Sequence, residues 1–216
     1  MTKTKSIFHK IIDVRYPWVG RSIRRLTSII PDKQYISWQY QRHMGKPINW
    51  ENPQTFNEKL QWMKVYWRDP LATKCADKYA VREYVEEIIG EQYLNKLLGI
   101  YDNVELINFD ELPNKFVIKA THGSAMNLIC SDKTKVDWQI EKKKLNRWLK
   151  TNYYYGNREW VYKDIKPRII CEDYLGDNIT DYKLYCFHGE PKYWFVATDR
   201  SSGVKAVFGN LKFPSL

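Results

Sequence analysis

A lysine within a short apolar segment constrains this chain more than any other feature. Residues 116–121 read Phe-Val-Ile-Lys-Ala-Thr. Alternate side chains of such a segment point to opposite faces when it forms a β-strand, with Phe116, Ile118 and Ala120 on one face. Lys119 lies on the other face, where a lysine ammonium costs free energy unless an anion or solvent reaches it. The segment predicts a two-faced strand whose lysine meets an anion or solvent.

A loop of small residues follows this strand. Residues 122–127 read His-Gly-Ser-Ala-Met-Asn, and a short apolar strand over 128–130 comes next. Two strands joined by small residues form a hairpin whose loop amides can cover a phosphate. The GxxxxGK[ST] and GxGxxG patterns are both absent, so neither of those phosphate-binding motifs is expected.

Helices are expected before this hairpin. Thr55 and Glu58 have the spacing of a capping box, and the apolar residues after them recur at helical intervals. These apolar residues are Phe56, Leu60, Met63 and Trp67. Asp69 and Pro70 end this helix and begin a second one, which is expected to run to Gly90.

Three cations share one face of the second helix, because Lys74, Lys78 and Arg82 recur at every fourth residue. Spacing alone favours a solvated basic stripe over an anion-binding one. A later helix, capped at Asp137, carries five cations outward, and these are most simply solvated as well. They are Lys142, Lys143, Lys144, Arg147 and Lys150.

The remainder of the chain predicts more strands. Residues 168–175 form an apolar strand with Glu172 and Asp173 at its exit. A hairpin is expected over 181–199, with its turn at 188–191, and the tail after Arg200 is too short for another full layer. Helices followed by antiparallel strands indicate an α+β or α/β fold.

The formal net charge of +10 requires an explanation, and part of it lies in the first 25 residues. This stretch is basic and partly amphipathic, so it could rest on an anionic membrane surface. We favour a solvated helix face docked on the protein. Nucleic-acid binding is not expected, because no helix-turn-helix spacing, zinc finger or RNP-type motif is present.

Cysteine and histidine spacing argues against a metal site built from these residues, since the four cysteines and four histidines are dispersed. No apolar run reaches the length of a membrane span, and the start of the chain lacks the features of a signal peptide. We therefore expect a cytoplasmic protein. The basic N-terminus adds the possibility of peripheral contact with the inner face of the membrane.

Five motifs in order resemble the TupA-like ATP-grasp proteins, and together they cover roughly residues 35 to 200. The first is Asn-Pro-Gln-Thr-Phe-Asn-Glu-Lys-Leu-Gln-Trp at 52–62. The others lie at 77–85, at 119–124, at 166–168 together with 172–175, and at 181–183.

The resemblance implies an ATP-grasp-like organisation. It divides the chain into a basic helical region over 1–50, a helical or α/β N-terminal domain over 51–112, an antiparallel-sheet lid subdomain over 113–175, and the start of a C-terminal subdomain over 176–216. In these proteins the acids that bind Mg²⁺ come from a C-terminal segment. Residues 201–216 contain no acid, so we expect the metal-binding part to be truncated and assign no metal ligand.

The resemblance also implies roles for individual residues. Lys119 and Lys78 correspond to the lysines that contact ATP phosphates. The remaining nucleotide-binding residues fall in the lid loop (His122, Gly123, Ser124 and Asn127) and in the hinge beside adenine and ribose (Glu172, Asp173, Tyr174 and Leu175). Lys183 and Arg200 resemble the catalytic cations that face the transferred phosphoryl group. The family usually has two glycines where this chain has Ala125 and Met126.

The function that the resemblance implies is ATP-dependent joining of a carboxylate to an amine through an acyl phosphate, with Mg²⁺, in bacterial surface-polysaccharide biosynthesis. The expected partners are an adenine nucleotide and a carboxylate-bearing sugar or amino-acid acceptor. Two alternatives stay open, so enzymatic activity itself is undecided. One is a non-catalytic relative that binds nucleotide or a glycan precursor. The other is a glycosyltransferase, as members of the family are often labelled, although residues 110–112 make a poor DxD motif.

Overall fold

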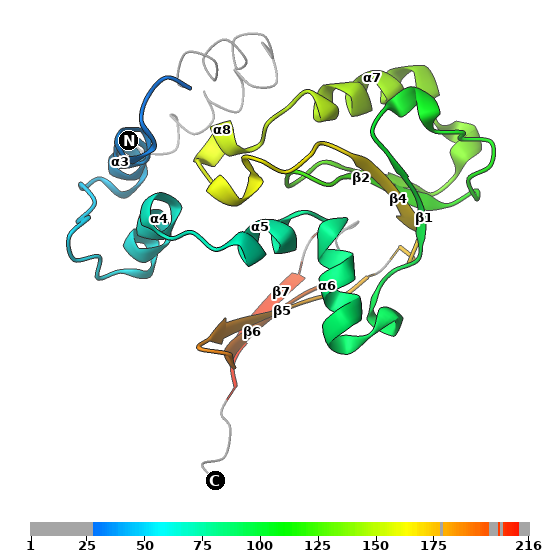
Figure 1. Ribbon diagram of the computed structural model, residues 1–216. Coiled ribbons are helices and arrows are strands. Elements are labelled where there is room, and N and C mark those ends of the chain that lie inside the picture. The colour runs from blue at the N-terminus through cyan, green and yellow to red at the C-terminus, as the bar shows by residue number, and fades with distance from the viewer. Residues whose placement is uncertain (1–27, 178, 199–202, 204, 212–216) are drawn as a thin grey trace. The chain divides into compact units, whose positions relative to one another are not determined.

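The structure is a computed structural model that describes residues 28–177, 179–198, 203 and 205–211 (Figure 1). The chain forms two compact units, Met1–Asp173 and Tyr174–Leu216, and each is described by itself. The basic stretch expected in the first 25 residues and the predicted catalytic Arg200 lie outside the described residues. Helices and antiparallel sheets make up the described chain, which confirms the α+β fold class.

Helices occupy the first part of the larger unit. They are α3 (Asp32–Met44), α4 (Phe56–Tyr66), α5 (Pro70–Ala76) and α6 (Ala80–Ile89), followed by the 3-10 turn η1 (Glu91–Tyr93). The capping box of α4 is confirmed. The Glu58 amide donates to Thr55 Oγ1 at 3.3 Å, and the Thr55 amide donates to Glu58 Oε2 at 2.9 Å. Asp69 caps α5 by accepting from the Leu71 amide, with Pro70 in the first turn.

The single helix expected from Pro70 to Gly90 is wrong, because the chain leaves helical geometry between α5 and α6. Asp77 is extended, with ψ of 113°, and its Oδ1 accepts from the Tyr79 amide at 2.9 Å. The Lys78 amide donates to the Thr121 carbonyl at 3.2 Å instead of to its own helix. Contacts with a distant strand therefore override the local helical pattern.

The apolar face expected on α4 exists, but it does not enter the core. Phe56, Leu60, Met63 and Trp67 are 57%, 39%, 38% and 37% exposed. Helical periodicity identified the face correctly, but it could not show whether another element of the chain covers that face.

One antiparallel sheet organises the rest of this unit. Its strands are β1 (Leu97–Tyr101), β2 (Phe116–Ala120), β3 (Asn127–Cys130) and β4 (Ile169–Asp173), in the order β1-β4-β2-β3. Phe116, Ile118 and Ala120 are fully buried on β2 while Val117 and Lys119 are half-buried, which confirms the predicted alternation. Lys119 therefore lies on the sheet face opposite the core.

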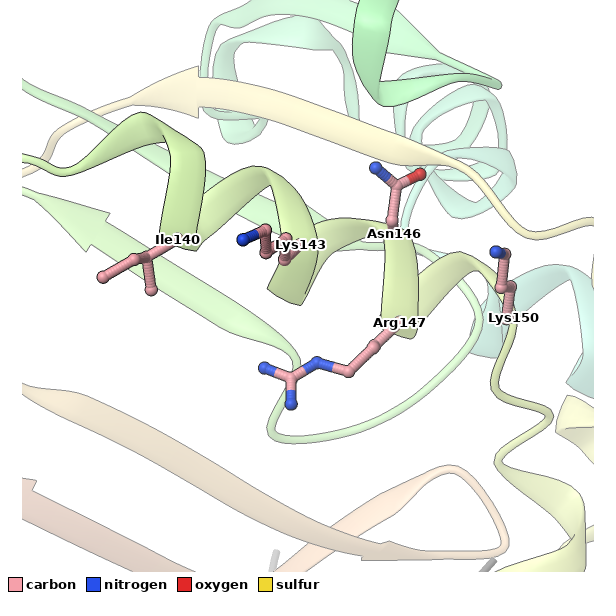
Figure 2. Close-up of a pocket in the computed structure, with 5 residues that line it drawn as sticks. All are labelled: Ile140, Lys143, Asn146, Arg147 and Lys150. Atoms are coloured by element: carbon pink, nitrogen blue, oxygen red, sulfur yellow. The ribbon is translucent and has the colours of Figure 1, made fainter. Parts of the chain in front are cut away.

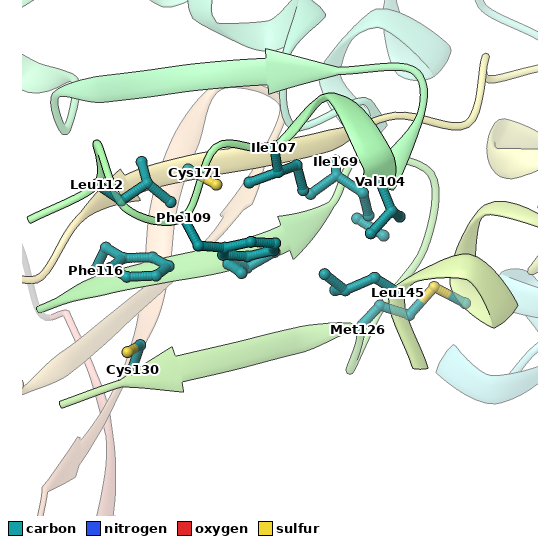
Figure 3. Close-up of a cluster of buried hydrophobic side chains, with 12 residues drawn as sticks. Val104, Ile107, Phe109, Leu112, Phe116, Met126, Cys130, Leu145, Ile169 and Cys171 are labelled. Atoms are coloured by element: carbon teal, nitrogen blue, oxygen red, sulfur yellow. The ribbon is translucent and has the colours of Figure 1, made fainter. Parts of the chain in front are cut away.

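Helix α7 (Trp138–Leu149) contributes to the core, and Asp137 caps it by accepting from the Gln139 and Ile140 amides. Leu145 is fully buried (Figure 3), and Trp138 stacks on Phe109 with ring centroids 4.1 Å apart. The 3-10 turns η2 (Val104–Leu106) and η3 (Lys133–Lys135) complete this region. The buried cluster is Val104, Ile107, Phe109, Leu112, Phe116, Ile118, Ala120, Met126, Cys130, Leu145, Ile169 and Cys171.

The smaller unit is a three-stranded antiparallel sheet in the order β5-β6-β7. Its strands are β5 (Asp181–Phe187), β6 (Glu190–Thr198) and β7 (Lys205–Asn210). The predicted hairpin is confirmed, with positive φ at His188 and Gly189 in its turn. Strand β7 was not expected, because the tail was judged too short for another layer. It extends the existing sheet instead, and Gly209 allows the indole of Trp194 to lie directly against its backbone.

A buried arginine connects α3 to the short helix α8 (Tyr154–Asn157), which the 3-10 turn η4 (Trp160–Tyr162) follows. The Arg158 side chain is 1% exposed, and its Nε lies 3.4 Å from Asp32 Oδ1. Its guanidinium lies 4.5 Å from the ring centroid of Tyr35 and 5.3 Å from that of Tyr154. Charge and stacking on aromatic faces together stabilise this guanidinium away from water.

Replacing Arg158 tests this connection. We expect Arg158→Ala to lower the free energy of unfolding by about 3 kcal/mol, because it removes the positive charge beside Asp32, which keeps its hydrogen bond from the Tyr154 hydroxyl, and opens a cavity between the rings. Urea unfolding measures the loss. The exposed Arg147 on α7 provides a matched control, and Arg147→Ala should change the stability by less than about 0.5 kcal/mol. Equal losses in the two variants would contradict a structural role for Arg158.

Candidate functional site

The carboxylate of Glu172 lies between two cations on the sheet face opposite the core. Glu172 Oε2 is 2.5 Å from Lys119 Nζ, and Glu172 Oε1 is 3.1 Å from Arg82 Nη1. The Glu172 side chain is 8% exposed and that of Lys119 is 33% exposed. The lysine on the two-faced strand therefore meets an anion, as its position predicted, and it remains accessible to a second one.

Lys78 joins the same region from the break between α5 and α6. Its Nζ donates to the Ala120 carbonyl at 3.1 Å and also to the Gly123 carbonyl. Burial lowers the pKa of Lys78, and the nearby Lys119 ammonium lowers it further. Lys78 thus fastens the loop after β2 to the helical region, and its ammonium lies near that of Lys119.

A second ion pair borders these residues. Asp77 Oδ2 lies 2.8 Å from Arg168 Nη2, and both side chains are largely buried. The Arg168 guanidinium lies 4.6 Å from the ring centroid of Tyr79, and the Arg168 carbonyl accepts from the Thr121 amide at 2.9 Å. A hollow of about 440 Å³ opens beside Arg82 and Arg168.

These six ionisable side chains form what we call the ionic cluster. It consists of Lys78, Arg82, Lys119 and Arg168 with Asp77 and Glu172. Four cations face two carboxylates, which leaves an excess of two positive charges. An excess of cations in a partly desolvated place favours binding of an anion.

The loop between β2 and β3 lies next to the ionic cluster. Ser124, Ala125 and Asn127 are exposed, and Ala125 adopts a positive φ of 59° that glycine takes more easily. Met126 is 9% exposed and belongs to the core, so its side chain does not occupy the outside of the loop (Figure 3). Gly123 packs closely on Tyr153, because a Cβ there would lie 3.1 Å from the ring and would require the ring to shift.

The imidazole of His122 is directed away from the loop surface. It is 2% exposed, and its Nε2 lies 3.0 Å from the Trp148 carbonyl, an acceptor that requires the proton on Nε2. Burial lowers the pKa of His122, although the hydrogen bond to the Trp148 carbonyl acts in the opposite sense. The neutral imidazole fastens the loop to α7, and the predicted contact of His122 with a nucleotide stays a prediction.

The other residues predicted for the site are placed as follows. Asp173 ends β4, where its amide donates to the Lys96 carbonyl at 3.0 Å and its carbonyl accepts from Asn95 Nδ2 at 2.8 Å. Tyr174 and Leu175 begin the smaller unit. Lys183 also lies there, paired with Asp181, and is described with that unit alone. The predicted roles of these residues stay predictions.

Arg82 and Arg168 are the cations that sequence reasoning missed. The spacing of Lys74, Lys78 and Arg82 was a signal, but the solvated stripe that it favoured is wrong. Lys74 pairs with Glu83, whereas Lys78 and Arg82 turn toward the sheet because the helix breaks between Lys74 and Lys78. Arg168 lies in the motif at 166–168, but nothing in the spacing indicated its ion pair, since its partner Asp77 is 91 residues away in the chain.

The outward face of α7 carries cations of two kinds. Lys142 pairs with Glu105 and Lys144 pairs with Glu141. The others line a shallow hollow together with Ile140 and Asn146, and Figure 2 shows them along the helix: Lys143, Arg147 and Lys150. These three extend into solvent, as the sequence predicted.

The described residues contain no group of three or more histidine, cysteine, aspartate or glutamate side chains placed to hold a metal ion. Within the same residues, no helix has the length and apolar character needed to cross a membrane. The ionic cluster is thus a site of ion pairs with a positive excess, next to a loop with the exposed residues Ser124 and Ala125.

The fold and the site define an α+β protein with a cationic site on one face of its four-stranded antiparallel sheet. A family model described as TupA-like ATPgrasp matches residues 58–215 of the chain. The chain belongs to the TupA-like ATPgrasp family. Comparison with curated proteins found no match, and comparison with solved structures also found none.

The lowered pKa of His122 makes a prediction about stability. As the pH falls below about 6.5, the unfolded chain takes up the proton first, so the folded state loses stability down to its own lower pKa. We expect His122→Gln to reduce this loss between about pH 7.5 and 5.5, before most carboxylates titrate. Urea unfolding at several pH values measures it. The exposed His43 is the control, and an equal change in His43→Gln would contradict the assignment.

Proposed function

We propose that the ionic cluster binds the phosphates of ATP and that the chain acts as an ATP-dependent carboxylate–amine ligase. The observation that carries the proposal is the Lys119 ammonium, which is paired with Glu172, partly exposed to solvent and close to the Lys78 ammonium. The negative charge of a triphosphate would balance the excess positive charge of the cluster. Membership of an ATP-grasp family supports the same nucleotide.

Each part of the cluster has a task in this proposal. Lys119 donates to a phosphate oxygen while Glu172 keeps its ammonium oriented. Lys78 uses two of its three N–H groups on the Ala120 and Gly123 carbonyls and directs the third to the phosphates. Backbone amides of the exposed loop around Ser124 are proposed to bind the phosphates as well. Glu172 to Leu175 are proposed to border adenine and ribose.

The ligase reaction is the finer part of the proposal. Bound ATP supplies the phosphoryl group that activates a carboxylate, and Mg²⁺ neutralises charge on the phosphate oxygens. The cation-rich cluster fits the triphosphate, whereas the described residues do not identify ligands for Mg²⁺. The proposed substrates are a carboxylate-bearing sugar or amino acid and an amine, in cytoplasmic assembly of a bacterial surface polysaccharide. Lys183 and Arg200 are proposed as the catalytic cations, on the ground of the family resemblance alone.

Lys119→Met tests nucleotide binding. It removes one charge-assisted hydrogen bond to phosphate, so we expect the affinity for Mg-ATP to fall by about tenfold or more. Titration calorimetry with the full chain measures it, and thermal unfolding verifies that the variant is folded. Lys143→Met removes an exposed lysine outside the site and should leave the affinity unchanged. Binding of sugar nucleotides with no preference for adenine would contradict the assignment of ATP as the ligand.

A separate assay distinguishes ligation from binding alone. Release of ADP that requires both a carboxylate and an amine supports the ligase. Saturable binding of Mg-ATP without such release, over a panel of uronic acids and amino acids, would contradict the ligase reaction. It would indicate that the chain binds nucleotide without catalysing ligation.

A further inference from the structure

A groove of about 400 Å³ lies between α4 and η4, in the larger unit. Leu60 and Met63 line it with apolar side chains, and Trp67 and Trp160 line it from the two segments. The indole centroids are 5.6 Å apart and the rings are inclined at 68°, so they form a corner with accessible aromatic surface. Trp67 is 37% exposed. Covering aromatic surface of this kind with a ligand is favourable, because it removes the surface from water.

A partly buried lysine enters the same groove. Burial lowers the pKa of Lys64, although the nearby Glu159 carboxylate acts in the opposite sense. Within the described part of the chain, the Lys64 ammonium has neither an ion-pair partner within 4.0 Å nor a hydrogen-bond acceptor. Lys64 and Glu159 are the charged residues that line this groove, and the Arg68 guanidinium lies 5.0 Å from the Trp160 ring centroid. A desolvated ammonium without a partner favours an anionic ligand.

The dimensions of the groove limit what it can hold. Its volume falls in the range of sites for small molecules, about 300 to 1,000 Å³. A peptide helix is about 10 to 12 Å across with its side chains and requires a larger groove. A purely apolar ligand would cover the indoles but leave Lys64 without an anion. A small ring with one apolar face and an acidic group satisfies both requirements.

We propose that this groove binds a carboxylate-bearing sugar. The C–H face of the sugar ring lies on the indoles of Trp67 and Trp160, because partially positive C–H groups meet the negative face of an aromatic ring. The sugar carboxylate pairs with the Lys64 ammonium, and Glu159 accepts from a sugar hydroxyl. The site uses no residue of the ionic cluster, so this inference does not depend on ATP binding.

Sugar titrations followed by the tryptophan indole N–H signals in NMR spectra test the proposal. The probes are glucuronic acid and glucose, added to the full chain without nucleotide, with Trp67→Phe and Trp160→Phe assigning the signals. We expect glucuronic acid to shift both indole signals and to bind about tenfold or more tightly than glucose, since it gains a charge-assisted hydrogen bond.

Variants separate the two kinds of contact. Lys64→Met should reduce the affinity for glucuronic acid to that for glucose, and Trp160→Ala should weaken both sugars. Lys59→Met and Trp38→Ala alter an exposed lysine and an exposed tryptophan outside the groove and should change neither affinity. These titrations remain informative in Lys119→Met, so a failure of nucleotide binding is distinguished from a failure of sugar binding.

Three outcomes overturn the proposal. The first is the absence of any saturable shift of the two indole signals with either sugar. The second is equal affinity for glucuronic acid and glucose, which would remove the role of Lys64. The third is concentration-dependent self-association abolished by Trp160→Ala without sugar binding, which would assign the groove to a second copy of the chain.

Discussion

The paired contacts of the Glu172 carboxylate are the interaction on which the candidate site depends. One oxygen bonds Lys119 from a neighbouring strand, and the other bonds Arg82 from a helix. A buried carboxylate is stable only when its charge is compensated, and a buried pair that loses one partner becomes strongly unfavourable. Glu172 therefore fixes both cations in place and orients Lys119 toward solvent, where a phosphate can reach it.

The fold makes this arrangement possible by using the two sheet faces differently. One face packs Phe116 and Ile118 into the core with α7, and the other carries Lys119 and Glu172. The break between α5 and α6 then brings Lys78 and Arg82 toward that second face. The core makes the sheet rigid, and the ion pairs hold the charged side chains of the opposite face in place. A site for a charged ligand requires both.

Local signals in the sequence predicted a substantial part of the fold around the site. Alternation identified the strand of Lys119, and cap spacing identified α4, because both depend on residues a few positions apart. The partners of Lys119 and Asp77 were not predictable from spacing, since they lie 53 and 91 residues away. The helix break at Lys78 and the exposure of the α4 face depend on tertiary contacts as well. Membership of the family was recognisable because five short motifs kept their order.

A structure of the full chain bound to a non-hydrolysable ATP analogue tests the central claim most directly. The account predicts phosphate oxygens within hydrogen-bonding distance of Lys119 Nζ and of amides in the loop around Ser124, with Glu172 still paired to Arg82 or Lys119. Phosphates bound away from Lys119, with the ionic cluster unchanged, would contradict it.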